Sequence, residues 1–324
     1  MARPVFQSVF ADYMYSYLET KVAAGFKETS FYGFLKGFDR FCVQRDMDAP
    51  VFAREDAEEW TKRKGAEATT THYSRINSSR QFLIYLAHKG LDVYVPRDVA
   101  FRPTEFAPHI YTASETERYF YAVDLFHSTD CKKDAVQYPV LFRILYCCGT
   151  RINETLGIRK CDVNLEEGII KLSECKNDDE RFIVLNEDLA GLMRRYADKC
   201  FYLLNDEDYI FTNRNGGRLC PDTVYERHRM FLKKAGIPFT GNGHGPRLHD
   251  WRHHMAVYSF KQLADSGLDM YVALPILSAY LGHKTIYATE RYVRLTMELF
   301  PYIEERFAEK INRVFGGGGN SETD

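Results

Sequence analysis

The sequence predicts a mainly α protein of two domains with one small antiparallel β-sheet, an α+β fold. The chain has 324 residues, which is enough for two domains that each bury a core. Apolar residues at helical spacing dominate the first ninety residues and return from Pro221 onward. Between these regions, two apolar runs within residues 168–185 flank a polar turn, which is typical of a β-hairpin.

The first domain is expected to be a helical bundle at residues 1–92. Apolar side chains recur every three or four positions, so that each segment has one face that can be buried. The expected helices cover residues 5–24, 31–43, 54–64 and 69–89. Three prolines and little helical periodicity mark residues 93–110 as a linker.

The second domain is expected at residues 111–296. Ser114 and Glu117 have capping-box spacing at the start of a helix, and an apolar helix at 136–149 ends at Gly149. After the domain, residues 297–315 carry apolar side chains every four positions and predict a C-terminal helix. The glycine-rich residues 316–324 predict a disordered tail.

Composition excludes some classes of protein. No apolar run reaches the roughly 20 residues of a membrane span, and the N-terminus does not resemble a signal peptide. The eight cysteines form no Cys-x-x-Cys pair, which favours reduced thiols and a cytoplasmic location. The formal net charge of −2 gives no overall basic signature for nucleic-acid binding, but a local basic groove is compatible with that charge.

Five short segments together carry the residue types that metal-free phosphodiester chemistry needs. Two guanidiniums can hold the non-bridging oxygens of a phosphate, a lysine or histidine can protonate the leaving oxygen, and a tyrosine can form a covalent intermediate. The segments are Gly149–Leu156 with Arg151, the hairpin residue Lys176, His249–His253 with Arg252, Leu281–His283, and Thr289–Tyr292.

Tyr292 is the candidate nucleophile. Forming a phenolate at pH 7 costs about 4 kcal/mol from a reference pKa near 10, which nearby cations and a proton-accepting histidine would offset. Because a phosphotyrosine bond keeps the energy of the phosphodiester, a second DNA end can reverse the attack without ATP.

These segments resemble the tyrosine recombinase, or phage integrase, family in order and spacing through most of residues 110–296. The resemblance implies that Arg151 and Arg252 clamp the scissile phosphate and that Lys176 is the general acid toward the 5′-oxygen. It further implies that His249 is a general base or acid, that His283 braces the phosphate, and that Tyr292 forms a 3′-phosphotyrosyl link. Trp251 departs from the family, which more often has leucine there.

The resemblance also implies a two-domain clamp around DNA, with an N-terminal core-binding domain and a catalytic domain. The expected function is site-specific recombination: integration, excision or resolution. The expected partners are double-stranded recombination sites and a homotetramer on two duplexes, with accessory or related recombinases. The 297–315 helix would be exchanged between protomers, and the protein would act at the nucleoid. No cofactor or metal is expected.

Several alternatives remain open at this point. A type IB topoisomerase shares the chemistry, and a DNA-binding regulator without catalysis belongs to another class. His249 and His253 have spacing that zinc could use, and Lys171 competes with Lys176 as the hairpin lysine. In the first domain, two interpretations are open for five polar residues. They either contact the DNA backbone or form a helix cap and a solvated helix face: Thr69, Thr71, Tyr73, Arg75 and Arg80.

Overall fold

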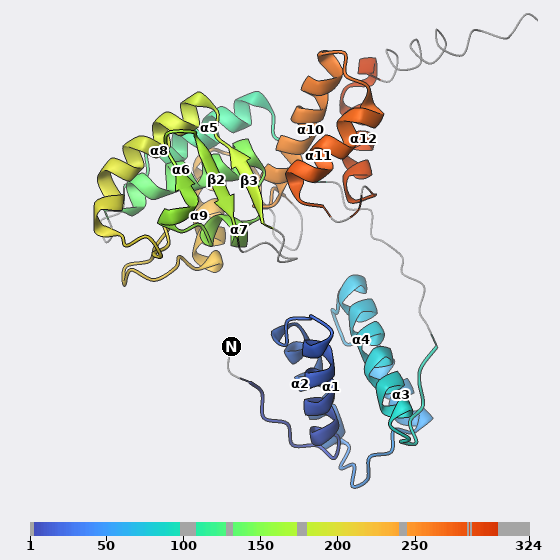
Figure 1. The fold of residues 1–324 in the computed structure, drawn as a ribbon. Helices are drawn as coiled ribbons and strands as arrows, with labels where there is room; N and C mark the ends of the chain where they lie inside the picture. Colours follow the sequence, from blue (N-terminus) through green and yellow to red (C-terminus); the bar gives the residue numbers. More distant parts are fainter. Residues whose placement is uncertain are drawn as a thin grey trace, which may run out of the picture. The chain divides into compact units, whose positions relative to one another are not determined.

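The computed structural model describes residues 3–97, 108–127, 132–173, 180–239, 245–283, 285 and 287–303. The chain divides into two compact units, Met1–Ala107 and Pro108–Asp324, which we call unit 1 and unit 2 (Figure 1). The division falls within the stretch 93–110 interpreted as a linker. The expected tail at 316–324 and residues 304–315 of the expected C-terminal helix lie outside the described residues.

Unit 1 is a helical bundle with an aromatic core. Its helices are α1 (Ala11–Ala23), α2 (Thr29–Gln44), α3 (Arg54–Thr61) and α4 (Thr69–His88). Phe38 lies at the centre, in contact with the rings of Phe10, Phe52, Trp60 and Phe82. Such ring contacts add about 0.5–1.5 kcal/mol each beyond the apolar area that they bury.

The first helix begins six residues later than the sequence predicts. The backbone N–H groups of Gln7 and Ser8 donate to the carboxylate of Asp39 at 3.0 and 2.8 Å, which holds this stretch in a non-helical conformation. Phe6 and Phe10 are nevertheless buried. The apolar pattern therefore predicts the burial of this segment correctly, but its helical start at residue 5 is wrong.

Unit 2 combines helices with a three-stranded antiparallel sheet of order β1-β2-β3. The strands are β1 (Val163–Asn164), β2 (Ile169–Leu172) and β3 (Arg181–Val184). β2 and β3 form the expected hairpin, with Ile169 opposite Val184 and Leu172 opposite Arg181. The helices are α5 (Ala113–Asp124), α6 (Asp134–Cys148), α7 (Ile152–Leu156), α8 (Glu187–Cys200), α9 (Pro221–Lys234), α10 (Asp250–Asp265), α11 (Met270–Leu281) and α12 (Tyr287–Leu299).

Two helix ends show how the local sequence sets the boundaries. Gly149 ends α6 at φ +58°, as the sequence predicts for its apolar helix. The capping box of α5 is formed by Thr112 and Glu115, through bonds of 3.2 and 2.8 Å, so the expected pair is wrong by two residues. Ser114 instead accepts a bond from Arg118 at 2.6 Å.

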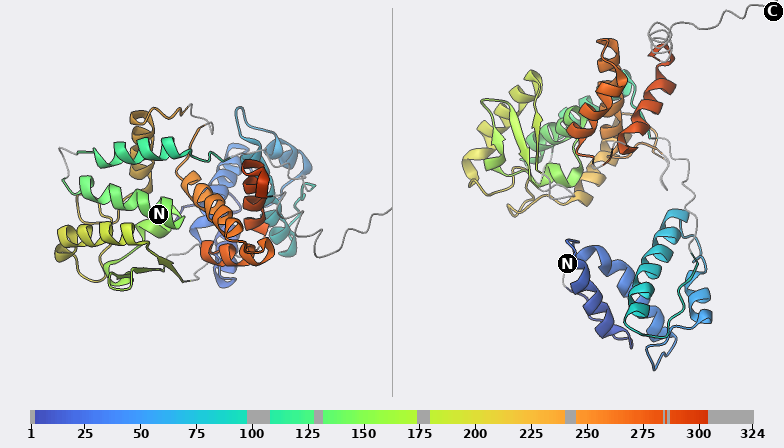
Figure 2. Two further views of the ribbon diagram at one scale, coloured as in Figure 1. Left: turned by 90° about the horizontal axis from the view of Figure 1, so that it is seen from above. Right: turned by 45° about the vertical axis from the view of Figure 1, so that its right-hand side comes forward.

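The helices α10, α11 and α12 lie together at one end of unit 2, apart from α8 (Figures 1 and 2). α10 packs against α6, α11 and α12, and α11 also contacts β3. This arrangement brings the ends of several elements to one place, where the motif residues lie.

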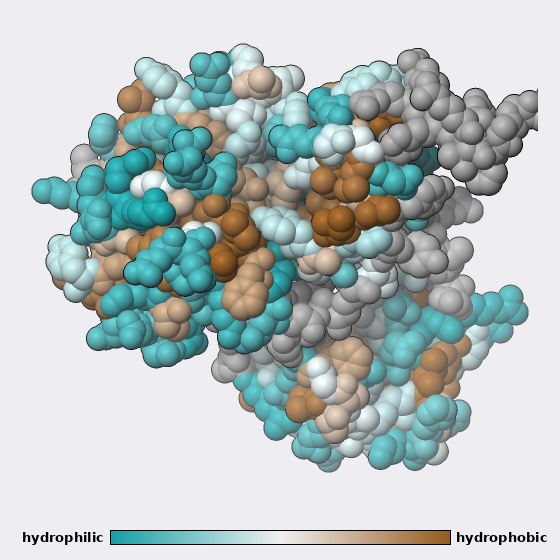
Figure 3. All heavy atoms as spheres, turned by 45° about the horizontal axis from the view of Figure 1, so that its top comes forward, coloured by the Kyte–Doolittle hydropathy of each residue, from teal (hydrophilic) through white to brown (hydrophobic). Residues whose placement is uncertain are grey.

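Apolar side chains also reach the surface of unit 2 (Figure 3). Val272 and Ile276 of α11 are about half exposed. None of the described helices combines the length and apolar character needed to cross a bilayer. The six cysteines among the described residues are free thiols.

Candidate active site

The C-terminal end of α11 organises the candidate active site. Gly282 adopts φ +64°, and a Schellman motif follows: Gly282 N–H donates to Ala279 and His283 N–H donates to Ser278, both at 3.0 Å. The carbonyls of Tyr280, Leu281 and Gly282 remain for other donors, because a helix end leaves its last carbonyls unpaired.

Arginines supply those donors. Arg252 Nη2 lies 2.6 Å from the carbonyl oxygen of Leu281, and Arg151 Nη2 lies 3.3 Å from that of Gly282. Arg181 Nη1 lies 2.5 Å from that of Tyr280. We call this set the arginine cap. The negative end of the α11 dipole favours cations at this position.

Arg252 is the most buried of these cations, at 2% exposure. Its Nη1 donates to the carbonyl of Gly149 at 2.7 Å, so α10 is tied both to the end of α6 and to the end of α11. Burial, and then the nearby Arg151, lower the pKa of Arg252 to about 10, and its guanidinium remains charged at neutral pH.

Arg151 lies at the N-terminus of α7 and is held by Glu154. Its Nη1 is 2.5 Å from Glu154 Oε1, and its backbone N–H donates to Glu154 Oε2 at 2.9 Å. Burial alone would raise the pKa of Glu154, but Arg181 and Arg151 outweigh burial and hold it below the ordinary value. Glu154 is therefore an ionised buried carboxylate shared by two arginines.

His283 is held between Arg252 and Thr289. Its Nε2 lies 3.0 Å from Arg252 Nη2, and its Nδ1 lies 2.7 Å from Thr289 Oγ1. Because arginine can only donate, Nε2 accepts and the Nδ1–H donates to Thr289. Burial, and then Arg252 and Arg151, lower the pKa of His283 to about 4, which agrees with this neutral tautomer.

Tyr292 lies on α12 against two histidine rings and is 3% exposed. Its ring is stacked on His283, with centroids 6.1 Å apart, and its centroid lies 5.5 Å from that of His253. Burial raises the pKa of the Tyr292 hydroxyl, and Arg252 opposes the rise. The phenol is therefore protonated at neutral pH, and forming the phenolate needs a base.

His249 supplies a candidate base at the N-terminus of α10. Its side chain is exposed, and its ring centroid lies 4.9 Å from that of the buried His253. The partial desolvation of the ring, and then Arg252, lower the pKa of His249 to about 4. His249 is therefore neutral at pH 7 and can accept a proton.

The start of unit 2 supports α10. The Tyr111 ring is stacked on Trp251, with centroids 3.7 Å apart and planes 6° from parallel. The buried carboxylate of Asp250 accepts bonds from the backbone of Arg247 at 2.9 Å and of His109 at 3.4 Å. Trp251, the departure from the family pattern, thus fixes the helix that carries His249 and Arg252.

Five of the six expected catalytic residues are grouped in this structure: Arg151, His249, Arg252, His283 and Tyr292. Lys176 lies outside the described residues. Its alternative, Lys171, forms an ion pair with Glu180 at 2.7 Å. Among the described residues, no group of three or more potential metal ligands occurs, so the zinc alternative for His249 and His253 lacks a third ligand.

The expected DNA contacts of unit 1 differ in their surroundings. Thr71 is exposed, Tyr73 and Arg80 are partly exposed, and Thr69 accepts a bond from Arg63 at 3.3 Å. Arg75 is turned into the unit: it pairs with Glu67 at 2.9 Å and donates to the carbonyls of Trp60 and Lys62. The guanidinium of Arg75 is thus engaged within unit 1 and is not available to a DNA phosphate.

Sequence reasoning missed three residues of the site, Glu154, Arg181 and Thr289, and it weighed His253, which lies against Tyr292, only as a zinc ligand. Glu154 lies three residues after Arg151, a spacing at which an ion pair on one helix face is expected. Thr289 stands within the last motif. Nothing local marks Arg181, because its partner Tyr280 is distant in the sequence.

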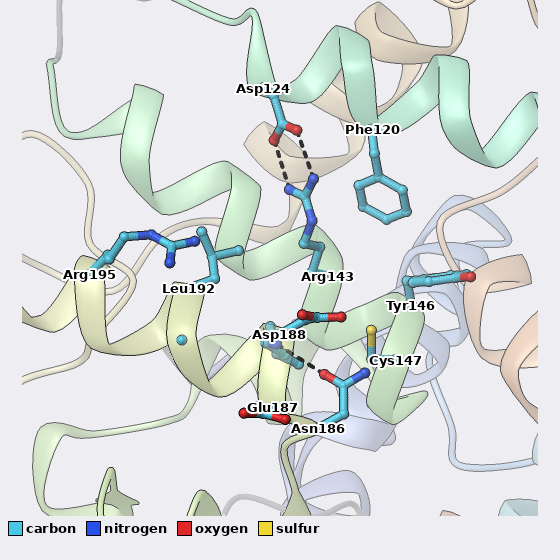
Figure 4. Close-up of a pocket in the computed structure, with 12 residues that line it drawn as sticks. Phe120, Asp124, Arg143, Tyr146, Cys147, Asn186, Glu187, Asp188, Leu192 and Arg195 are labelled. Atoms are coloured by element: carbon cyan, nitrogen blue, oxygen red, sulfur yellow. Dashed lines mark hydrogen bonds and ion pairs between the residues drawn. The ribbon is translucent and has the colours of Figure 1, made fainter.

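A groove of unit 2 lies away from these residues. It is formed between α5, α6 and α8, and it contains the ion pair of Arg143 with Asp124 (Figure 4). None of the five grouped motif residues lines it. An enclosed pocket is not needed for a substrate as large as a DNA duplex.

The grouped motif residues are of the types that transfer of a phosphodiester to a tyrosine would need. The family model of the phage integrase family matches residues 117–298, which is more than half of the chain. The protein belongs to this family, and it is a tyrosine recombinase.

The sequence is similar to those of curated tyrosine recombinases over most of its length. The tyrosine recombinase XerC of Staphylococcus saprophyticus is 26% identical, over 83% of this chain and 86% of that protein. A tyrosine recombinase of Pseudothermotoga lettingae is 22% identical, over 95% of this chain and 98% of its own. The fold is similar to that of the Tn1549 transposon integrase in complex with transposon right end DNA, with a TM-score of 0.63, 16% identity, and 89% and 98% of the two chains covered.

Proposed function

We propose that this protein binds duplex DNA at specific sites and recombines them through a covalent 3′-phosphotyrosyl intermediate at Tyr292. The observation that carries the proposal is the convergence of Arg151, Arg252, His283 and Tyr292 at the C-terminal end of α11. Two guanidiniums next to a buried tyrosine are what an in-line attack on a phosphodiester requires.

In the proposed reaction, the Tyr292 oxygen attacks phosphorus while its proton passes to neutral His249. The bond from phosphorus to the 5′-oxygen breaks, and Lys176 donates the proton that this oxygen takes up. Rejoining reverses these steps with a 5′-hydroxyl of the partner strand. Atoms and charges balance without a cofactor.

The hydrogen bond between His283 Nδ1 and the Thr289 hydroxyl allows His283 to change its tautomer. In the structure its Nε2 accepts from Arg252. When Arg252 turns its donors to a phosphate, the proton of His283 can reside on Nε2 and donate to the phosphate, while Thr289 Oγ1 donates to Nδ1. A hydroxyl can take either role, which an aliphatic side chain at position 289 could not.

The DNA contacts proposed for unit 1 are Thr69, Thr71, Tyr73 and Arg80 on α4. Phosphate contacts position a protein without reading sequence, so Arg80→Ala should weaken binding to all duplexes similarly. It should also reduce the slope of log affinity against log salt concentration by about one. Assembly of a homotetramer on two duplexes, with exchange of the 297–315 segment, belongs to the same proposal.

A pool of nicked duplexes with a randomised central sequence tests the function. Nicking near the cleavage point lets the short fragment diffuse away, so covalent protein–DNA adducts accumulate and can be recovered and sequenced. The wild type should yield adducts with a common sequence, and Tyr292→Phe should yield none. Tyr258→Phe, on neighbouring α10, is the control and should yield adducts as the wild type does.

Three outcomes would contradict the proposal. Adducts formed by Tyr292→Phe would show that the nucleophile is another residue. Absence of adducts from the wild type across the pool would show that the site does not cleave DNA. Relaxation of a supercoiled plasmid that carries two recovered sites, without any recombinant product, would assign a topoisomerase instead.

A further inference from the structure

Arg181 completes the pairing of the α11 end. Of the carbonyls from Ser278 to Gly282, two are satisfied by the Schellman motif and three by the arginine cap. Two members of this cap, Arg151 and Arg252, belong to the proposed phosphate clamp. The third comes from the first residue of β3, at the return of the hairpin whose loop carries Lys176.

The guanidinium of Arg181 has two fixed anchors. Nη1 donates to Tyr280 at 2.5 Å, and Nη2 lies 2.7 Å from Glu154 Oε2. Its side chain is only 10% exposed, and Gly282 leaves room for it, because a Cβ there would lie 3.0 Å from Arg181 Cδ. Arg181 is thus enclosed by the helix end that holds His283 and by the carboxylate that holds Arg151.

We propose that Arg181 is a positioning residue for the strand transfer reaction: it holds Glu154 and the end of α11 in register, and it preserves the positive charge of the phosphate site. This inference rests on the proposed function. Its consequences differ from those of an ordinary core arginine, because one anchor, Glu154, pairs directly with Arg151. The other anchor, the carbonyl of Tyr280, lies next to the helix-end carbonyls that accept from Arg252 and Arg151.

The charges explain the second part of the proposal. Arg151, Glu154 and Arg181 together carry +1, so a net positive charge remains for the phosphate. Without Arg181, Glu154 and Arg151 would sum to zero, and the net charge of the site with Arg252 included would fall from +2 to +1, which weakens its attraction for a dianionic transition state. Losing one preorganised donor or charge at such a site typically costs about 100- to 1,000-fold in rate.

Four variants separate charge from packing. Arg181→Met removes the charge and both bonds, whereas Arg181→Lys restores the charge and one bond. Arg181→Met combined with Glu154→Gln restores the net +1 without restoring the arginine. The control is Arg143→Met, which removes an equally direct arginine–carboxylate pair, with both contacts to Asp124 at 2.7 Å, from the distant groove (Figure 4).

The assay is the single-turnover rate of adduct formation on a nicked duplex of recovered sequence at saturating protein. DNA affinity is measured separately by gel shift. Arg181→Met should be at least about 100-fold slower than the wild type, with affinity changed less than about threefold. Arg181→Lys and the double variant should each recover at least about tenfold over Arg181→Met. Arg143→Met should cleave at the wild-type rate.

The possible failures are distinguishable. If the wild type forms no adduct, the proposed function fails. If the wild type and Arg181→Met cleave alike, the function stands and the role of Arg181 is overturned. If Arg181→Met is slow but neither Arg181→Lys nor the double variant recovers, the arginine acts through packing alone and the charge argument is wrong.

Discussion

Gly282 has a left-handed backbone conformation and lies against Arg181 of the arginine cap. Its replacement by alanine therefore gives a quantitative test of how tightly Arg181 is held. Gly282 has φ +64°, where an L side chain is strained, and a Cβ there would lie 3.0 Å from Arg181 Cδ and 3.2 Å from its Nε. Gly267 offers a matched control, since it ends α10 at φ +84° with nothing within 4 Å of its added Cβ.

The two variants share the backbone cost and differ in the contact. Alanine in the left-handed conformation costs about 1–2 kcal/mol at either position. At 282, Arg181 would have to move, although its two bonds of 2.5 and 2.7 Å leave little freedom. Losing one bond to a charged group costs about 1.5–3 kcal/mol. We expect Gly267→Ala to lower the free energy of unfolding by about 1–2 kcal/mol and Gly282→Ala by about 3–5 kcal/mol.

Urea unfolding measures this difference, followed by tryptophan fluorescence, which in unit 2 comes from Trp251 alone. Adduct formation on a nicked duplex gives the second readout: Gly267→Ala should keep the wild-type rate and Gly282→Ala should lose it. Equal destabilisation by both variants would refute the reasoning, because the Cβ contact with Arg181 would then contribute nothing.

Two further predictions concern the support of α10 and the response to acid. Trp251→Leu removes the stacked contact with Tyr111 and leaves a void, so the free energy of unfolding should fall by about 2 kcal/mol or more in a urea titration; an unchanged midpoint would contradict it. Buried His228, His253 and His254 have pKa values of about 3, 3 and 4, below the 6.5 of an unfolded chain, so the unfolded state binds more protons as the pH falls. The free energy of unfolding should therefore decline between pH 6.5 and about 4 by about 1.4 kcal/mol per pH unit for each histidine. In His254→Phe this slope should be smaller by about 1.4 kcal/mol per pH unit. An unaltered slope would show that His254 is not neutral in the folded protein.

Periodicity predicted much of the fold because burial of one face is a local property of a segment. The helices at 31–43 and 69–89, the apolar helix ending at Gly149 and the β2–β3 hairpin all occur within a few residues of their predicted bounds. The start of α1 was wrong because a distant carboxylate, Asp39, binds the backbone there. The cap of α5 was wrong because Thr112 and Ser114 both have a glutamate three residues later, and in the fold Thr112 pairs with Glu115 while Ser114 accepts from Arg118.

Site residues that belong to short sequence motifs could be predicted. Residues whose hydrogen-bond or ion-pair partners come from distant elements could not. The combination and order of residue types in the motifs are specific to this chemistry, and they identified Arg151, His249, Arg252, His283 and Tyr292. Arg75 has the same appearance as a DNA-binding arginine in the sequence, yet Glu67 and two backbone carbonyls engage it. A charged residue on a predicted helix face is therefore a weak predictor of a binding surface until its own partners are known.

The arginine cap gives a physical reason why motifs that are distant in the sequence lie together at the end of α11. A helix end with three unpaired carbonyls attracts cations, and a Schellman glycine brings the next residue, His283, back beside them. The carbonyls that hold Arg151 and Arg252 are neutral and are therefore weaker acceptors than a phosphate. In the proposed reaction, a phosphate would draw the guanidiniums of Arg151 and Arg252 from these carbonyls to its own oxygens. In that reaction the Leu281–His283 segment would act through its backbone carbonyls as well as through its histidine, and Arg181 would keep its contacts with Tyr280 and Glu154 while Arg151 and Arg252 turn to the phosphate.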